Sequence, residues 1–378
     1  MVYHYLDGSR QHSAFRWISE AVPRPLRGKT VISSKLALRF TAASLLAALI
    51  LYVLFRNIDL RLLGESIKRS SSWGLALAAL VNLLQWPVRA LRWQRLVRAS
   101  GEPISMRSAL EATVIGNSMS VALPGRLGEV AQPALLSLQE RISLALSMGS
   151  FATTRVLDVL TVLAGFGIGL FLAAPSAWVA SWSTIGRKLS YMSPFIAAGL
   201  LGALVVASRW YLSTRQRSWA IRFRQNRIGR QLDLMTLGLS GLAQPKVLMG
   251  SLATSLATWL LISASTWIGL AACNVDLPIA AVLVLMPLLV IGIAVPTPAG
   301  VGGYHAAMTF GLVQLYSIDR TAAAGASILV HLVQTVPIVA FALVIYLTGS
   351  RSVPRMDQLL DATKEDPVED IEAKRQES

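Results

Sequence analysis

The sequence predicts an all-α polytopic membrane protein, and two features of its composition indicate this fold. Of the 378 residues, 54% are hydrophobic and only 15% are charged, whereas soluble domains carry nearer a quarter charged residues. The apolar residues also fall in blocks of about 20, the length that a helix needs to cross a bilayer. A transmembrane barrel would show short segments of alternating hydrophobicity instead. We therefore expect about seven to nine helical membrane segments.

Charge divides the chain into three parts. The formal net charge is +15, yet the stretch 349–378 is rich in Asp and Glu, and we expect it to be a disordered cytoplasmic tail. Residues 1–35 are too polar, and too rich in Arg and Pro, for a secretory signal, so we expect a cytoplasmic tail there too. Residues 36–348 then form the membrane domain. Its basic residues cluster between apolar blocks, which favours positive-inside topology and contact with anionic lipid over nucleic acid.

The predicted membrane segments follow one another closely. A loop at 209–230 contains seven arginines and no acidic residue, which is the strongest sign of a cytoplasmic segment. The single cysteine, Cys273, rules out an intramolecular disulfide, and no sequence motif for a metal or an organic cofactor occurs, so neither is expected. We expect long spans at 36–55, 73–90, 144–173, 191–207, 248–272, 278–295 and 323–347, and shorter apolar runs at 108–123 and 303–316.

Proline and glycine interrupt two apolar runs at corresponding places of the two halves. The first break is V-A-L-P-G-R-L-G-E-V-A-Q at 121–132, and the second is A-V-P-T-P-A-G-V-G-G-Y-H at 294–305. Backbone that leaves a helix at membrane depth must be buried in protein or line a polar cavity, and a pair of broken segments is typical of a transporter's binding site. Placing the arginine-rich segments on the cytoplasmic side predicts re-entrant hairpins at 108–143 and 278–316, related as an inverted repeat. Two thin full spans at each place are the alternative.

Arginines mark the end of the second predicted span. Arg89, Arg92 and Arg95 recur every third residue on one helix face, beside Trp86 and Trp93. This pattern favours a belt at the membrane interface, with arginines that extend toward the head groups. The alternative is a specific lipid head-group site formed by Arg89 and Arg92. Either interpretation places this end of the span on the cytoplasmic side.

Two pairs of opposite charge are candidates for substrate binding. Arg126 and Glu129 lie at the first break, and Arg155 and Asp158 lie one helical turn apart inside a long apolar span. An unpaired arginine at that depth costs at least about 3 kcal/mol, so Arg155 needs a partner, which Asp158, Glu129 or a lipid phosphate could supply. The alternatives are an interfacial surface pair for the first and an ion pair that only fixes helix packing for the second.

The second break exposes backbone groups and contains few charged side chains. Its two prolines and three glycines expose amide and carbonyl groups, and a helix that begins after them could bind an anion. The only ionisable group there is His305, which either packs in the interior or lines a polar route with His331 and Gln334 of the last span. The residues assigned to this part of the substrate site are Gly300, Gly302, Gly303 and His305.

Taken together, these motifs resemble the family of lysylphosphatidylglycerol synthase transmembrane regions, also called flippase-like domains. The resemblance covers roughly 36–348 and rests on L-R-W at 91–93, P-x-R-x-G-E at 124–129, R-x-x-D at 155–158 and P-x-P-x-G-x-G at 296–302. The second motif of the family often ends in Glu, where this chain has His305. Members with a soluble aminoacyl-transfer domain carry it after the membrane region, where this sequence has the charged stretch 349–378. Aminoacyl-lipid synthesis by this chain alone is therefore not expected. The resemblance implies a lipid-handling membrane protein.

These observations lead to one leading hypothesis and two alternatives. The leading hypothesis is a flippase of the bacterial inner membrane that moves an anionic phospholipid or isoprenoid-linked lipid, with both termini in the cytoplasm. Membrane lipids are then its partners, and a lipid-synthesis enzyme is a candidate protein partner. The first alternative is a membrane glycosyl- or lipid-group transferase with Glu129 or Asp158 as base, although no donor-binding motif supports it. The second is a membrane scaffold for a lipid-synthesis enzyme.

Overall fold

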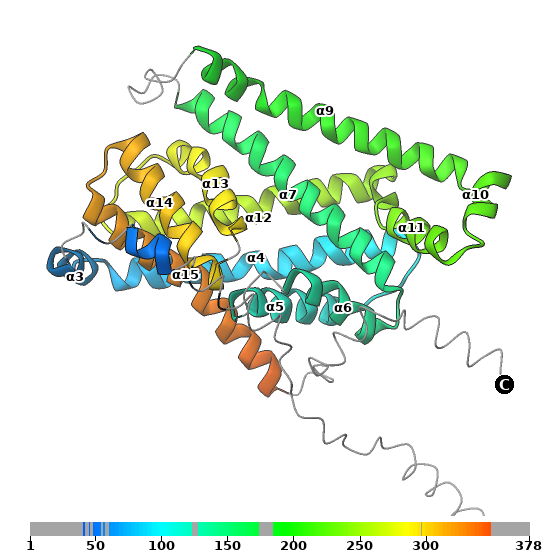
Figure 1. Cartoon of the computed structure of the whole chain (residues 1–378), viewed down its shortest axis with the longest axis horizontal. Coiled ribbons are helices and arrows are strands. Elements are labelled where there is room, and N and C mark those ends of the chain that lie inside the picture. The colour runs from blue at the N-terminus through cyan, green and yellow to red at the C-terminus, as the bar shows by residue number, and fades with distance from the viewer. Residues whose placement is uncertain are drawn as a thin grey trace, which may run out of the picture. The chain divides into compact units, whose positions relative to one another are not determined.

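The computed structural model describes residues 41, 45, 48–53, 56, 60–122, 128–173, 184–295 and 297–348, which all lie in one compact unit. Every regular element in these ranges is a helix (Figure 1), and five helices are long and apolar enough to cross a membrane. The predicted all-α polytopic fold is therefore confirmed. Both predicted tails and most of the span at 36–55 lie outside the described residues. The five long helices are α4 (Ser72–Ala99), α7 (Leu144–Leu172), α9 (Thr184–Thr214), α12 (Pro245–Ala272) and α15 (Arg320–Leu347).

Helices α4 and α12 form an antiparallel pair that packs along its whole length. The Ser265 hydroxyl donates to the carbonyl of Ala78 at 2.8 Å near one end, and Arg95 donates to the carbonyl of Gly250 at 3.2 Å near the other. Helix α4 begins where the Ser71 side chain accepts a hydrogen bond from the third residue after it, and it continues through Pro87 to Ala99. The predicted span at 73–90 was therefore too short, because the arginine-bearing end remains helical.

The two broken segments form two helical hairpins. Helix α5 (Met106–Ala122) packs against α6 (Gly128–Glu140), and α13 (Ile279–Ala294) packs against α14 (Val301–Tyr316). At 1.5 Å per residue these helices are about 20–26 Å long, shorter than the hydrocarbon core of about 30 Å. Such lengths suit hairpins that enter the membrane and turn back. The re-entrant character of the hairpins, the faces from which they enter and the inverted repeat stay predictions.

Glycines let the helices of each hairpin approach closely. A methyl group on Gly303 of α14 would collide with the carbonyl oxygen of Gly292 on α13, and one on Gly128 of α6 would collide with the carbonyl oxygen of Gly116 on α5. Both hairpins are thus closed by backbone-to-backbone contact, which only glycine permits. The glycines of the two sequence motifs therefore have a packing role in addition to any contact with a ligand.

The arginine-rich segment 209–230 is mostly helical, although the sequence predicted a loop. It comprises the end of α9, then α10 (Ser218–Phe223) and the start of α11 (Arg227–Leu237). Asp233, just beyond the predicted loop, binds Arg215 at 2.9 Å and Arg224 at 3.9 Å. Partial burial lowers the pKa of Arg215, but the hydrogen bonds that it donates to Asp233 outweigh this effect and leave the pKa raised. The fold of this segment rests on one acidic residue that pairs with two of the arginines.

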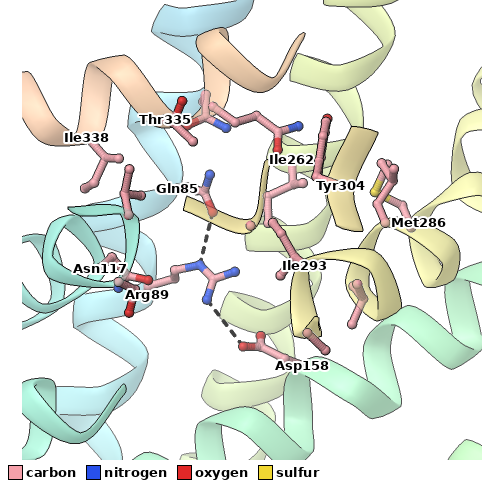
Figure 2. Close-up of a pocket in the computed structure, with 18 of the residues that line it drawn as sticks. Gln85, Arg89, Asn117, Asp158, Ile262, Met286, Ile293, Tyr304, Thr335 and Ile338 are labelled. Carbon is pink, nitrogen blue, oxygen red and sulfur yellow. Dashed lines mark hydrogen bonds and ion pairs between the residues drawn. The ribbon is translucent and has the colours of Figure 1, made fainter. Parts of the chain in front are cut away.

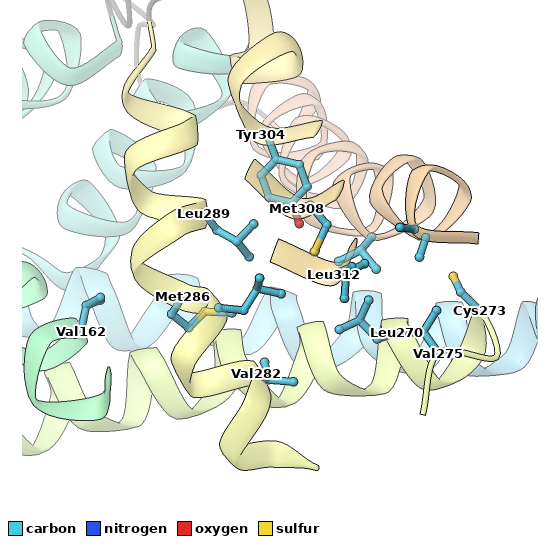
Figure 3. Close-up of a cluster of buried hydrophobic side chains, with 14 residues drawn as sticks. Val162, Leu270, Cys273, Val275, Val282, Met286, Leu289, Tyr304, Met308 and Leu312 are labelled. Atoms are coloured by element: carbon cyan, nitrogen blue, oxygen red, sulfur yellow. The ribbon is translucent and has the colours of Figure 1, made fainter. Parts of the chain in front are cut away.

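The second hairpin and α15 enclose the largest apolar core of the described residues. Met286 and Leu289 of α13 pack against Tyr304, Met308 and Leu312 of α14 (Figure 3). Helix α15 covers this core and also contacts α3 (Leu60–Lys68), α4, α5 and α12. It begins at Asp319, whose carboxylate accepts hydrogen bonds from two backbone amides of its first turn. Helix α15 thus joins the second hairpin to the first.

Candidate functional site

A cavity of about 450 Å³ lies between the two hairpins, bounded by the long helices α4, α7, α12 and α15 (Figure 2). Both breaks in the sequence reach it, because Glu129 follows the first break and Gly300 belongs to the second. Its polar wall comprises Asn82, Gln85, Trp86, Arg89, Asn117, Ser120, Glu129, Arg155, Asp158, Trp259, Tyr304, His331, Gln334 and Thr335. The sequence prediction of a polar cavity between two broken segments agrees with this geometry.

Asp158 is the centre of a cluster of charges at one side of this cavity. Its carboxylate lies 2.8 Å from Nη1 of Arg92, 3.3 Å from Nη1 of Arg89 and 3.5 Å from Nη1 of Arg155. Two of these arginines come from α4, 66 and 69 residues earlier in the chain, and one comes from α7 itself. The predicted pairing of Arg155 with Asp158 is present, and the two arginines of α4 make the shorter contacts.

The burial of these arginines differs from the expected interfacial belt. The side chain of Arg92 is 1% exposed and that of Arg89 is 13% exposed, so both point into the helix bundle. The reason is the carboxylate of Asp158, since a buried ion pair needs an opposite charge at close range. Arg89 lines the cavity, whereas Arg92 lies behind it.

Neutral side chains hold the charged cluster in position. Gln85 accepts a hydrogen bond from Nε of Arg89 at 3.0 Å, and Figure 2 shows Arg89 between Gln85 and Asp158. The indole N–H of Trp259 donates to Oδ1 of Asp158 at 3.0 Å. Arg92 donates to Oγ of Ser255 at 2.7 Å. The cluster is therefore fixed by α4, α7 and α12 before any ligand arrives.

Two of these contacts were not predictable from the sequence. Trp259 lies in an apolar span, where a tryptophan is usually a packing or interface residue. Gln85 and Asn82 were visible as polar residues inside a span, but their contacts were not.

The Oδ1 of Asn82, Nε1 of Trp86 and the hydroxyl of Tyr304 are buried without a hydrogen-bond partner among the described residues. Each of these three residues lines the cavity.

The first break contributes Glu129, and Arg126 lies outside the described residues. Glu129 is the second residue of α6 and lines the cavity. The first turn of a helix favours a carboxylate, because the free backbone amides there carry partial positive charge. Glu129 therefore lies at the cavity wall, and its role in substrate binding stays a prediction.

The second break contributes backbone in an unusual conformation. Ala299 has φ 55° and Gly300 has φ 68°, so two consecutive left-handed residues turn the chain into α14. Both line the cavity. An alanine in this region costs about 1–2 kcal/mol, and backbone strain of this kind concentrates at binding sites.

The other residues predicted at the second break lie behind the cavity wall. Gly302 and Gly303 are buried inside α14, where Gly303 contacts Gly292. His305 is also buried, with Nδ1 3.1 Å from Oγ of Ser327. Of the polar route proposed from the sequence, His331 and Gln334 line the cavity. No group of three or more His, Cys, Asp or Glu side chains is placed for metal binding in the described ranges.

Comparison with known proteins gives two matches. A family model described as "Lysylphosphatidylglycerol synthase TM region" matches residues 40–342. The chain is also similar to the protein "Glycosyltransferase AglD" of Haloferax volcanii, with 23% identity over 292 residues. That similarity covers 69% of this chain and 46% of AglD, so this chain spans about half the length of that relative.

Proposed function

The chain belongs to the family of lysylphosphatidylglycerol synthase transmembrane regions, and from this premise we propose that it binds an amphipathic lipid with an anionic head group and moves it across the membrane. The observation that carries the proposal is the cluster of three guanidinium groups around the single carboxylate of Asp158. Two of these arginines, Arg89 and Arg155, line the cavity. An anionic group inside the cavity would lie within reach of both.

The geometry of the cluster suits a phosphate. Arg89 and Arg155 both line the cavity, and guanidinium groups bind phosphate oxygens through paired hydrogen bonds. Burial strengthens such contacts, because less water competes for the charges. In this role Asp158 positions the arginines and offsets the free-energy cost of burying their charges.

The remaining wall suits the hydrocarbon part of a lipid. Apolar side chains of α7, α12 and α13 face the same cavity, among them Val159, Ile262 and Leu289. A volume of about 450 Å³ falls within the range of small-ligand sites, which are mostly apolar with a few polar groups that fix orientation. A head group and the first methylene groups of its tail would fill it.

The finer parts of the proposal follow the sequence predictions. Arg126 and Glu129 act with Arg155 and Asp158 on the head group, and the backbone at Gly300 serves the opposite wall. The protein resides in the bacterial inner membrane with both termini in the cytoplasm, where the arginines at 209–230 attract anionic lipid. A lipid-synthesis enzyme is the protein partner that such a transporter would serve.

Reconstituted vesicles test the proposal. Phosphatidylglycerol with a fluorescent label on its tail is added to proteoliposomes, and extraction by albumin measures how much has crossed to the inner leaflet. The wild-type protein should accelerate crossing, and Arg155→Ala should reduce the rate at least tenfold. The control is Arg61→Ala, because the Arg61 side chain is 88% exposed and far from Asp158 in sequence. Equal rates for wild-type vesicles and protein-free vesicles would overturn the proposal.

A second candidate, a membrane glycosyl-group transferase, is favoured by one observation. The relative AglD is named a glycosyltransferase, and this chain matches 46% of it. A transferase would change the mass of the lipid in the presence of a sugar donor, whereas a transporter leaves the lipid unchanged. Mass spectrometry of the lipids recovered from the vesicles separates the two.

A further inference from the structure

Two buried histidines lie side by side at the wall of the cavity. His331 of α15 lines the cavity and is 4% exposed, and His305 of α14 lies behind it and is 6% exposed. Their ring centroids are 5.0 Å apart, and the ring of Tyr304 lies 4.5 Å from that of His331. Two of the four histidines of the chain thus form a contiguous pair beside the lipid site.

Hydrogen bonds define which nitrogen of His305 is basic. The hydroxyl of Ser327 donates to the carbonyl of Ala324 at 2.7 Å, so its oxygen can only accept from Nδ1 of His305, at 3.1 Å. The proton of neutral His305 is therefore on Nδ1, and Nε2 is left to take another proton. Neither ring nitrogen of His331 makes a well-formed hydrogen bond to the described residues, although the backbone of Ala299 is nearby.

The surroundings of the pair contain no carboxylate in contact with it. Within the described ranges, no ion pair joins either histidine to an acid. Helix α13 and the short turn before α14 carry no ionisable side chain. The ionisable groups of the other elements around α14 and α15 are Arg89, Arg92, Arg95 and Arg98 of α4, Arg107 and Glu111 of α5, Glu129 of α6, Arg155 and Asp158 of α7, Lys246 of α12, Arg61, Glu65 and Lys68 of α3, and, on α14 and α15, Tyr304, Tyr316, Arg320 and Tyr346.

Three of the acids among these groups pair with arginines. Asp158 is shared by three arginines, Glu111 pairs with Arg107 at 2.8 Å, and Glu65 pairs with Arg61 at 3.6 Å. A buried imidazolium without a counter-charge is unfavourable. Glu129 lines the same cavity, but no ion pair joins it to His331 in the described ranges. An anion held inside the cavity would place a counter-charge beside His331.

We propose that His331 and His305 form a proton-binding site that fills together with the anionic lipid, so that the protein binds one proton with each head group. This inference rests on the proposed function, because the head group is the counter-charge. By thermodynamic linkage, an anion that favours protonation of the pair is itself bound more tightly when the pair is protonated. Histidine is suited to this role because its charge changes near neutral pH.

The far side of the pair leads away from the arginine-rich end of the molecule. Ser327 of α15 contacts His305. Two residues earlier, Gly325 packs against Ser66 of α3, whose Oγ lies 3.2 Å from where a Cβ at Gly325 would stand. Helix α3 lies at the opposite end of the bundle from α10, which is part of the arginine-rich stretch 209–230 (Figure 1). Protons taken from the α3 side would reach the cavity through His305 and then His331, which would let a proton gradient drive the lipid.

The experiment measures lipid binding to the full-length protein in phosphatidylcholine nanodiscs at pH 5.5, 6.5 and 8.0. The probe is fluorescent phosphatidylglycerol, because its phosphodiester keeps one negative charge throughout this range. Wild-type protein should bind the probe about tenfold more tightly at pH 5.5 than at pH 8.0. The double variant His305→Gln/His331→Gln should lose this dependence and keep the weaker affinity.

The matched control is His4→Gln/His12→Gln, which removes the other two histidines of the chain and should keep the full pH dependence. Binding that is independent of pH in the wild-type protein, or a dependence that persists without His305 and His331, would overturn the inference alone. No binding at any pH would overturn the proposed function and this inference with it. If the double variant does not fold, His331→Gln alone should show the same loss, because His331 is the member of the pair that faces the ligand.

Discussion

The charge of Asp158 should be required for stability, because its carboxylate contacts three buried or partly buried guanidinium groups. Asp158→Asn preserves shape and an oxygen for Trp259 but removes the negative charge. Removing one member of a buried ion pair costs about 3–5 kcal/mol, since the partner charge is left uncompensated. For a chain of 378 residues that loss corresponds to a fall in Tm of about 4–6 °C.

The chain contains its own reporter for this measurement. Its single cysteine, Cys273, is buried, so a thiol-reactive dye added to purified protein in detergent becomes fluorescent only as the protein unfolds. Glu102→Gln is the control, because this exposed acid should change stability by less than about 0.5 kcal/mol.

A double variant tests whether the loss comes from charge. Arg92 is the closest cation to Asp158 and is 1% exposed, so Arg92→Met in the Asp158→Asn background removes one of the uncompensated charges. The two substitutions together should cost at least about 1 kcal/mol less than the sum of their separate costs. Equal stability of Asp158→Asn and the wild type, or strictly additive losses, would refute the assignment of Asp158 as the counter-ion of the arginines.

Three further substitutions test other parts of the structure by the same thermal assay. Gly303→Ala should destabilise the protein by about 1–3 kcal/mol, since its methyl group meets the carbonyl of Gly292. The control is Gly199→Ala, whose methyl group meets nothing within 4 Å and which should leave the stability nearly unchanged. Equal losses of stability in the two variants would contradict the packing argument. Ala299→Gly should stabilise by up to about 1 kcal/mol by relieving its positive φ, and any loss of Tm would count against strain there. Trp259→Phe should cost about 1.5–3 kcal/mol by removing the hydrogen bond to Asp158, and an unchanged Tm would show that this bond adds nothing.

The sequence was sufficient for the fold class and for the two hairpins. Long apolar blocks predict helices because a bilayer demands continuous backbone hydrogen bonding, and the proline and glycine clusters mark where the chain leaves the helix. The apolar run that became α7 was predicted to within one residue. The contact between Arg155 and Asp158 was also predictable from their spacing, since residues three apart share one helix face.

The contacts between distant segments were not predictable in this way. The i, i+3 pattern of Arg89 and Arg92 gives one helix face but does not say whether that face meets lipid or protein, and Asp158 decides it from 69 residues away. The segment at 209–230 shows the same limit. Its charge indicates a side of the membrane, whereas its helical structure depends on pairing with Asp233.

The most direct test of the central claim is to locate the bound head group. Vesicles are prepared with an anionic phospholipid that carries a photoreactive group next to its phosphate, and mass spectrometry maps the cross-linked residues after illumination. The account predicts adducts at the cavity wall, on Asn117, Tyr304 or Gln334, that disappear in Arg155→Ala. Adducts confined to the arginine-rich stretch 209–230 would contradict it, because the lipid would then bind the surface and not the cavity.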